Sequence, residues 1–177
     1  MAILKVAQMG HPVLRARAQA VDRRDIKTTR IQRLIDDMME TMHEYHGIGL
    51  AAPQVHEELR IFLAVLEDGD ERETALRPVA IINPELTLTG EIVEDWEGCL
   101  SIPDIRGQVP RPRDVHLRGL DRNGERIDVN LRDYPARVVQ HEHDHLDGIL
   151  FFDRMRSFET LTYLTEYGKY WSRDRED

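Results

Sequence analysis

The feature that most restricts how this chain can fold is a run of charged and histidine side chains inside an apolar stretch. Residues 140–148 read QHEHDHLDG, follow ARVV and precede ILFF. In a helix each residue turns the chain by about 100°, so His141 and His145 lie on one face, whereas His143 points to roughly the opposite side. Apolar flanks are typical of a buried helix, here about residues 136–147. We therefore expect a central helix that brings two histidine rings together in the interior.

Glu142 gives this segment the pattern H-E-x-x-H, in which two histidines on one helix face bind a metal and the glutamate acts as a general base beside it. The pattern is short and also arises by chance, so a solvated helix turn rich in histidine is the alternative. The apolar flanks favour the buried metal-binding helix. His143 is expected to serve packing or a surface contact, not chemistry.

The composition is that of a globular protein. The 177 residues are 41% hydrophobic and 32% charged, enough for one sizeable core. No apolar run approaches the roughly 20 residues of a membrane span, and we read no secretory signal at the start. The single cysteine, Cys99, excludes an internal disulfide, and the net charge of −9 argues against broad nucleic-acid binding. We expect a cytoplasmic protein that binds neither membranes nor free nucleic acid.

Helices and strands are predicted in separate parts of the chain. The patterns favour helices over about 12–20, 29–46 (with Gly47 as a natural stop), 136–147 and 157–170. They favour strands at about 59–66, 79–83 and 86–93, and a hairpin of DVHLRGL and ERIDVNL around residues 121–124. Without βαβ alternation, the expected class is α+β: antiparallel sheets packed around the central helix, with an amino-terminal helical region and a carboxy-terminal helix.

Two histidines need a third ligand, since catalytic zinc-type sites usually take three protein ligands and keep one position open. Downstream candidates are Asp147, Asp153, Glu159 and Glu166, the last at a spacing that a thermolysin-like protease could use. Upstream, Cys99 stands in WEGCLS, where Gly98 permits a close backbone approach. A lone cysteine is more often a small buried residue than a ligand, so the residues alone leave this choice open.

A third stretch, HGIGLAAPQV (residues 46–55), combines small residues with one side-chain donor, Gln54. It lacks the lysine and the spacing of a phosphate-binding loop. Tight packing after a helix end explains Gly47. The remaining small residues, which run on to Gln54, suggest that its amide is placed to donate to an oxygen.

Together the three stretches resemble the peptide deformylase family. The family motifs G-x-G-L-A-A-x-Q, E-G-C-L-S and Q-H-E-x-D-H match residues 47–54, 97–101 and 140–145 without a mismatch and in the same order. The resemblance covers roughly residues 4–155 and leaves 155–177 as a variable carboxy-terminal helix or tail. It implies a single catalytic domain over 1–177 and a hydrolase of N-terminal methionine processing, which removes the formyl group from formyl-methionine of newly made proteins and releases formate.

The resemblance also implies roles for particular residues. Cys99, His141 and His145 would bind one divalent metal, with Fe²⁺ the expected ion and Zn²⁺, Ni²⁺ or Co²⁺ as alternatives. Glu142 would take a proton from the attacking water and pass it to the leaving amine. The implied oxyanion donors are the side-chain amide of Gln54 and the backbone N–H of Leu100.

The residues implied to bind the peptide are Ile48, Gly49, Gly98, Arg106 and Val138. Ile48 and Gly98 match positions that pair with the substrate backbone as an added strand. Val138 matches a position in the methionine pocket, and Arg106 matches an arginine beside the substrate chain.

Two other functions are kept as alternatives. One is a thermolysin-like protease with Glu166 as third ligand, and the other is a non-catalytic relative that binds a metal or a peptide. The ribosome is an expected partner, since nascent chains are the implied substrate and residues 154–175 carry a mild basic excess. A solvated helix face is the favoured explanation of that excess, with ribosome docking as the alternative.

Overall fold

The computed structural model describes residues 2–66 and 78–172. Its elements, in chain order, are η1 (Pro12–Arg15), α1 (Thr29–Glu44), β1 (Gly49–Ala51), η2 (Ala52–Val55), β2 (Ile61–Ala64), β3 (Val79–Cys99), β4 (Ile102–Leu120), β5 (Arg126–Arg132), α2 (Asp133–Leu146), η3 (Phe151–Arg154), β6 (Thr162–Tyr163) and α3 (Leu164–Tyr170). The expected α+β class, with a central helix between an amino-terminal helical region and a carboxy-terminal helix, is confirmed.

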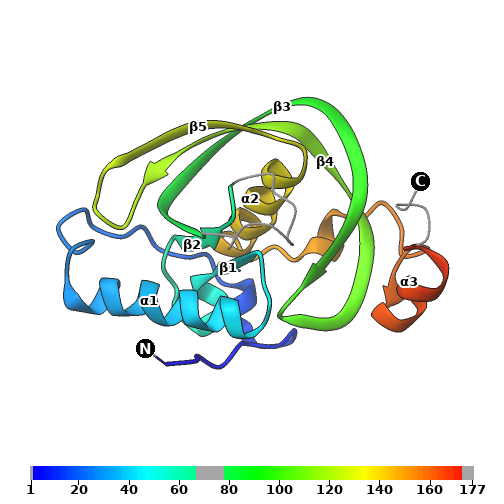
Figure 1. The fold of residues 1–177 in the computed structure, drawn as a ribbon, viewed down its shortest axis with the longest axis horizontal. Helices are drawn as coiled ribbons and strands as arrows, with labels where there is room; N and C mark the ends of the chain where they lie inside the picture. Colours follow the sequence, from blue (N-terminus) through cyan, green and yellow to red (C-terminus); the bar gives the residue numbers. More distant parts are fainter. Residues whose placement is uncertain (1, 67–77, 173–177) are drawn as a thin grey trace.

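The strands form one connected antiparallel sheet in the order β1-β2-β3-β4-β5, with β6 paired to β4. The long strands β3 and β4 form a hairpin that arches over α2, and β5 continues the arch (Figure 1). Three register shifts, between Ile82 and Glu85, Thr89 and Ile92, and Gly98 and Cys99, interrupt the β3–β4 ladder. Such bulges bend a strand, which is how a single sheet can curve around a helix.

The short strands β1 and β2 lie between α1 and α2 (Figure 1). Successive side chains of a strand point to opposite faces. Accordingly, Ile61 and Leu63 pack in the core with α1, whereas Phe62 and Ala64 pack in the core with α2. This two-sided burial explains why β2 is apolar at every position. Two cores therefore share one pair of strands, and α2 is fixed from several sides.

Helix α2 is buried from Pro135 to Leu146, apart from the half-buried His143, although more than half of its residues are polar. It contacts β1, β2, β4 and β5, and Ala136, Val139 and Leu146 form its apolar side. Residues 140–142, 144 and 145 are buried polar or charged residues on the same helix. Burying polar groups costs free energy unless they are hydrogen-bonded or bind a ligand, so this helix is the place to look for a functional site.

Several predicted elements differ from the observed ones. The helix expected over 12–20 is only the four-residue η1, because the following segment bonds to distant backbone: the N–H of Ala18 donates to the carbonyl of Leu146, and Gln19 bridges to Leu59. The strands expected at 79–83 and 86–93 are one strand, β3, since β4 pairs along both parts.

At the carboxy-terminal end, the helix expected over 157–170 is confined to α3, of seven residues. The preceding residues are extended because Thr162 and Tyr163 pair with β4, and the hydroxyl of Thr160 accepts the N–H of Gln108. The hairpin of β4 and β5 around residues 121–124 is confirmed. No helix in the described ranges is long and apolar enough to cross a membrane.

Candidate metal centre and active site

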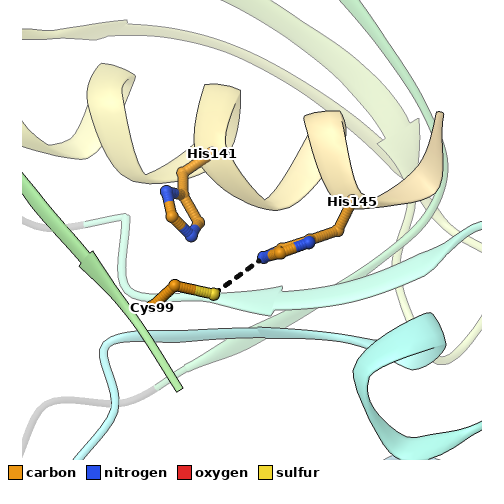
Figure 2. A group of neighbouring side chains, drawn as sticks. All are labelled: Cys99, His141 and His145. Carbon is orange, nitrogen blue, oxygen red and sulfur yellow. Dashed lines mark hydrogen bonds between the residues drawn. The ribbon is translucent and has the colours of Figure 1, made fainter. Parts of the chain in front are cut away.

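Three potential metal ligands meet where β3 ends against α2. Cys99 is the last residue of β3, and His141 and His145 lie four residues apart on α2. One ligand atom from each of the three lies within 4.8 Å of the others, and Sγ of Cys99 is 3.3 Å from Nε2 of His145 (Figure 2). Elsewhere in the described ranges, no group of three histidine, cysteine or acidic side chains could hold a metal ion.

Local structure explains this meeting. Residues four apart on a helix stack on one face, so the two histidine rings lie side by side with centroids 5.0 Å apart. A register shift between Gly98 and Cys99 breaks the regular ladder just before the ligand. Bulges often re-aim a side chain next to a functional site, and this one lies directly before the thiol that faces the helix.

Glu97 orients the first histidine. The Nδ1 of His141 donates to Oε2 of this buried carboxylate at 2.9 Å, which leaves Nε2 of His141 toward Cys99 (Figure 2). Burial alone would raise the pKa of Glu97, but the charge of Arg111 and hydrogen bonds from His141 and Arg111 outweigh it and hold that pKa well below its usual range. Glu97 is therefore an anion that holds one ring orientation, as carboxylates behind metal-binding histidines commonly do.

Two buried arginines hold Glu97 in place. Arg111 donates from Nε and Nη2 to its carboxylate at 2.6 and 3.0 Å, and Arg137 donates from Nη1 at 2.7 Å. Arg111 also donates to Asp144 of α2 at 2.8 Å, and Asp144 accepts from Arg154 at 2.7 Å. A buried network of this kind is weak evidence for net stability, but it fixes α2 against the β3–β4 hairpin.

Two buried polar atoms at the site lack a hydrogen-bond partner among the described residues: Oε2 of Glu142 and Nδ1 of His145. Orphaned polar atoms are rare in folded proteins and point to a ligand, a solvent molecule or a reactive role. Burial raises the pKa of Glu142 to about 7. A carboxyl group that titrates near neutral pH is well suited to accept and return a proton.

Gln54 presents its amide to the same place. The N–H of Ala51 donates to Oε1 of Gln54 at 2.8 Å, which fixes the orientation of the amide. Its Nε2 therefore points to the cluster, 3.5 Å from Sγ of Cys99 and 3.2 Å from Oγ of Ser101. Leu100, the other expected oxyanion donor, lies with Ser101 in the turn between β3 and β4.

The small residues before Gln54 make room for the side chains of Glu142 and Leu100. A Cβ atom on Gly49 would lie 2.7 Å from Cδ of Glu142, closer than side chains tolerate. A Cβ atom on Gly47 would lie 3.2 Å from Cδ1 of Leu100. A side chain at position 49 would therefore displace the Glu142 carboxylate from its present place.

A cavity of about 640 Å³ opens beside this cluster. Its lining includes almost all of the residues singled out from the sequence: Ile48, Gly49, Gln54, Gly98, Cys99, Leu100, Arg106, Val138, His141 and Glu142. His145 lies deeper and is almost fully buried. The volume lies within the range of pockets that enclose small ligands or a few residues of peptide.

Two other sequence candidates lie elsewhere. Glu166 is on α3, where its carboxylate pairs with Lys169 at 2.7 Å, and it does not belong to the ligand cluster. His143 points away from the cluster, with Nε2 3.1 Å from Nη2 of Arg60 and Nδ1 3.6 Å from Asp147. The thermolysin-like alternative therefore lacks Glu166 as its third ligand. His143 makes side-chain contacts outside the cluster, as expected from the sequence.

Sequence reasoning missed the supporting residues Glu97, Arg111, Asp144 and Ser101. A signal for Glu97 was present, because it lies inside the EGCLS stretch two residues before Cys99. The partnership of Arg111 and Asp144 could not be read from the sequence, since 33 residues separate them along the chain.

The donor set fits a divalent metal ion. A thiolate and two imidazoles are the ligands that zinc, iron and cobalt accept in proteins. The structure adds the matching support: Glu97 fixes His141, and the site holds an orphaned carboxylate oxygen on Glu142. Three protein ligands beside an open cavity are the usual arrangement of a catalytic, rather than a structural, metal site.

Comparisons with known proteins agree with this geometry. The family model described as polypeptide deformylase matches residues 3–160. Peptide deformylase 2 of Nostoc sp. is 42% identical over 167 residues, which cover 93% of this chain and 91% of that protein. Peptide deformylase of Pseudothermotoga lettingae is 43% identical over 156 residues, which cover 88% and 84%.

Solved structures show the same fold. The Met-Ala-Ser-bound class I type b peptide deformylase of Acinetobacter baumannii superimposes with a TM-score of 0.81 at 36% identity, over 87% of this chain and 99% of that one. The enzyme of Thermus thermophilus gives 0.77 at 42% identity, over 86% of both chains. On this evidence, and with a cysteine–histidine–histidine cluster beside a buried glutamate, the chain belongs to the polypeptide deformylase family.

Proposed function

We propose that this cavity is where the chain removes the formyl group from N-formyl-methionyl peptides. The observation that carries the proposal is the convergence of a buried carboxylate, Glu142, and an oriented amide, Gln54, on the cluster of three ligands. Family membership supports metal-dependent amide hydrolysis. The residue roles below are inferred from contacts and chemistry.

Cys99, His141 and His145 are the residues that would hold one divalent metal ion. When bound, such an ion polarises a carbonyl group and makes water acidic enough to supply hydroxide near neutral pH. We propose Fe²⁺ as the ion, with Zn²⁺, Ni²⁺ or Co²⁺ able to replace it. Thiolate ligation of Fe²⁺ makes the site sensitive to oxidation, which gives the proposal a direct test.

Glu142 moves the proton. Its carboxylate lies within the cavity, and burial places its pKa near 7, so it can accept a proton from the attacking water and return it to the leaving amine. The amide of Gln54 and the backbone N–H of Leu100 would donate to the oxygen that becomes negative as water adds to the formyl carbon. The products are formate and a peptide with a free amino terminus.

The peptide backbone is proposed to bind as an added strand. β1 is the edge of the sheet, and the final residues of β3 pair only with β4 among the described strands. Ile48 and Gly49 beside the first edge, and Gly98 beside the second, line the same cavity. Pairing with such edges holds a peptide through main-chain hydrogen bonds, and Val138 would contact the methionine side chain.

We also propose a cytoplasmic location and the ribosome as a partner. In the described part of the tail, Arg154 pairs with Asp144, and Lys169 pairs with Glu166. Arg156 is 67% exposed, with Nη1 3.8 Å from Glu94, and Arg173 and Arg175 lie outside the described residues. Unchanged co-sedimentation with ribosomes after truncation at residue 157 would exclude this role.

The decisive assay uses anaerobically prepared protein and formyl-Met-Ala-Ser, with formate release and metal content measured on the same sample. We expect formate release with one divalent ion per chain, decay in air, and protection after exchange to Ni²⁺ or Co²⁺. Cleavage of an internal peptide bond would indicate a protease instead. Bound metal without any turnover would indicate a non-catalytic relative, and air-stable activity with stoichiometric zinc would contradict Fe²⁺.

A further inference from the structure

The amino-terminal segment crosses the site before it enters η1. Its start is fixed to α1, because the N–H of Ala2 donates to Oδ1 of Asp37 at 2.7 Å and the N–H of Leu4 donates to Oγ1 of Thr41 at 2.8 Å. The segment, dark blue in Figure 1, then runs along α1, reaches the turn between β3 and β4, and continues to η1. Residues 5–11 are therefore anchored in the fold at both ends.

Two backbone N–H groups of this segment bond to the two stretches that carry the proposed oxyanion donors. The N–H of Ala7 donates to the carbonyl of Gln54 at 2.7 Å, and the N–H of Met9 donates to the carbonyl of Ser101 at 2.8 Å. Both distances are at the short end of the range for backbone hydrogen bonds. Ser101 follows Leu100 in the turn, so the segment makes one bond beside each donor.

The two stretches come from distant parts of the chain. They touch through the side-chain amide of Gln54, whose Nε2 lies 3.2 Å from Oγ of Ser101, 47 residues further along. That nitrogen carries two N–H donors, so one can hold Ser101 while the other faces the cavity. A side-chain contact restricts the two backbones less than main-chain bonds to a shared segment do. The bonds from Ala7 and Met9 therefore add the firmer link.

The linking segment is itself held in place. Ala7 is 2% exposed and packs in the apolar cluster that includes Ile102 and Phe151. Between the two bonds, Gln8 lines the cavity, with its Nε2 3.4 Å from the carbonyl oxygen of Leu100. This side-chain contact is long and exposed, so the two backbone bonds are the main link.

The separation of the two donors matters for the rate. Oxyanion donors act when they lie about 2.7–3.1 Å from the oxygen that becomes negative. A displacement of about 1 Å from such a geometry can cost ~10²-fold in rate. The amide of Gln54 comes from η2 and the N–H of Leu100 from the β3–β4 turn, so their separation depends on how these two elements are held. A link between the elements should affect kcat more than the binding of the ground state.

We propose that residues 7–9 are a positioning segment of the active site, which holds the Gln54 amide and the Leu100 N–H at the separation that the reaction needs. Ala7 and Met9 act through their backbone N–H groups, and neither residue lines the cavity. The inference rests on the proposed deformylation. It gives a role in the rate to an amino-terminal segment that lies outside the three sequence motifs.

The first test removes one N–H at position 9. Met9→Pro lacks this donor, whereas Met9→Ala loses the same exposed side chain and keeps the donor. For Met9→Pro we expect kcat for formyl-Met-Ala-Ser to fall by ~10- to 100-fold, with KM, binding of the product Met-Ala-Ser and metal content unchanged. Met9→Ala should stay at wild type. Lys5→Pro is the control for proline itself, since Lys5 is exposed and its N–H donates to no described residue.

The second test keeps every side chain of the segment. An ester bond in place of the peptide bond between Val6 and Ala7, made by cell-free translation with lactic acid at position 7, removes the N–H that donates to Gln54 and leaves the buried methyl group. In the otherwise wild-type protein, kcat should fall. In a Gln54→Ala background the ester should cost no further activity, because this double-mutant cycle leaves no amide to position. The ester protein also decides the question if circular dichroism shows that Met9→Pro does not fold.

Wild-type kcat in a folded Met9→Pro variant or in the ester protein would overturn the positioning segment. Equal losses in Met9→Ala, or parallel losses of metal and product binding, would also overturn it, because they indicate a general structural effect. An ester that costs as much without the Gln54 amide as with it would show that the bond does not act through that donor. A wild-type protein that releases no formate would overturn the deformylation, and with it the catalytic role of the segment, so the two failures are distinguishable.

Discussion

The imidazole of His141 donates from Nδ1 to a carboxylate oxygen of Glu97 at 2.9 Å, and both residues are buried. The second histidine of the pair has no such support, since Nδ1 of His145 lacks a hydrogen-bond partner among the described residues. Glu97 therefore orients the ring of His141 by a hydrogen bond, whereas no described residue bonds to Nδ1 of His145. Because of this asymmetry, we expect the loss of Glu97 to reduce metal affinity more than the loss of any other supporting residue.

Glu97→Gln should weaken metal binding by ~10- to 100-fold, the usual effect of removing the partner behind a metal-binding histidine. The amide keeps the shape of the side chain but removes the negative charge that faces His141, Arg111 and Arg137. Because two buried guanidinium groups then lose their anion, the free energy of unfolding should fall by ~3–5 kcal/mol. Chelator competition measures the affinity, and thermal unfolding of the metal-free protein measures the stability.

Glu94→Gln is the matched control for that variant. Glu94 lies on the same strand, but its side chain is 41% exposed and its carboxylate is 3.8 Å from Arg156. Exposed pairs of this kind contribute little, so metal affinity and melting temperature should stay at wild type. If both variants lost metal equally, general loss of negative charge would explain the effect, and Glu97 would have no special role.

Gly49→Ala should keep the metal and lose most activity. The added methyl carbon would lie 2.7 Å from Cδ of Glu142, so the carboxylate has to move out of its position. The three atoms nearest to that methyl carbon all belong to Glu142, so we expect the proposed ligands Cys99 and His145 still to bind the ion. Metal analysis together with kcat tests this, and a fully active variant would show that the carboxylate is free to adopt another position.

The helix that carries the site could be predicted because its constraints are local. Spacing of four residues puts His141 and His145 on one face in any helix, and the observed α2 begins at Asp133 and ends at Leu146, close to the expected 136–147. The hairpin of β4 and β5 could also be predicted, because the turn sequence at residues 121–124 is local. The long helix also ends two residues earlier than expected, where His46, with φ of 52°, takes the left-handed position that glycine usually occupies.

Features that depend on distant partners could not be predicted. Residues 16–20 have no helix because their backbone forms hydrogen bonds with Leu146, Glu58 and Arg60. The strand β3 continues past Asn83 and Pro84, which look like a break in the sequence, because β4 pairs on both sides of the shift. The ligand set was identified by resemblance to family motifs and not by physics alone, since the residues left Cys99 and Glu166 as rival third ligands.

Glu142→Gln should retain the metal and lose ~10²–10⁴-fold in kcat, the usual contribution of a general acid–base group. The amide is nearly the same size and can stay beside Gly49, but it cannot accept a proton. The assay follows formate release under anaerobic conditions, with metal content measured on the same preparation. Activity within a few-fold of wild type would show that the proton takes another route.

Cys99→Ala should lose bound metal and activity together, whereas Glu166→Ala should keep both. The thiol lies 3.3 Å from Nε2 of His145 in the cluster, while the Glu166 carboxylate pairs with Lys169 on α3. The two variants thereby compare the rival third ligands directly. Normal metal stoichiometry in Cys99→Ala would refute the ligand assignment.

His143→Met should leave the metal in place and keep activity within a few-fold of wild type. This holds although His141 and His145, two positions away on either side, are both proposed ligands. The reason is geometric, because His143 lies on the opposite side of α2, where its ring contacts Arg60 and Asp147. Methionine can fill that half-buried space but gives up the polar contact, so we expect a loss of ~1 kcal/mol in the free energy of unfolding. His141→Ala and His145→Ala should lose metal and activity while circular dichroism confirms the fold. If His143→Met lost its metal with the helix intact, the ligand set drawn from α2 would have to be revised.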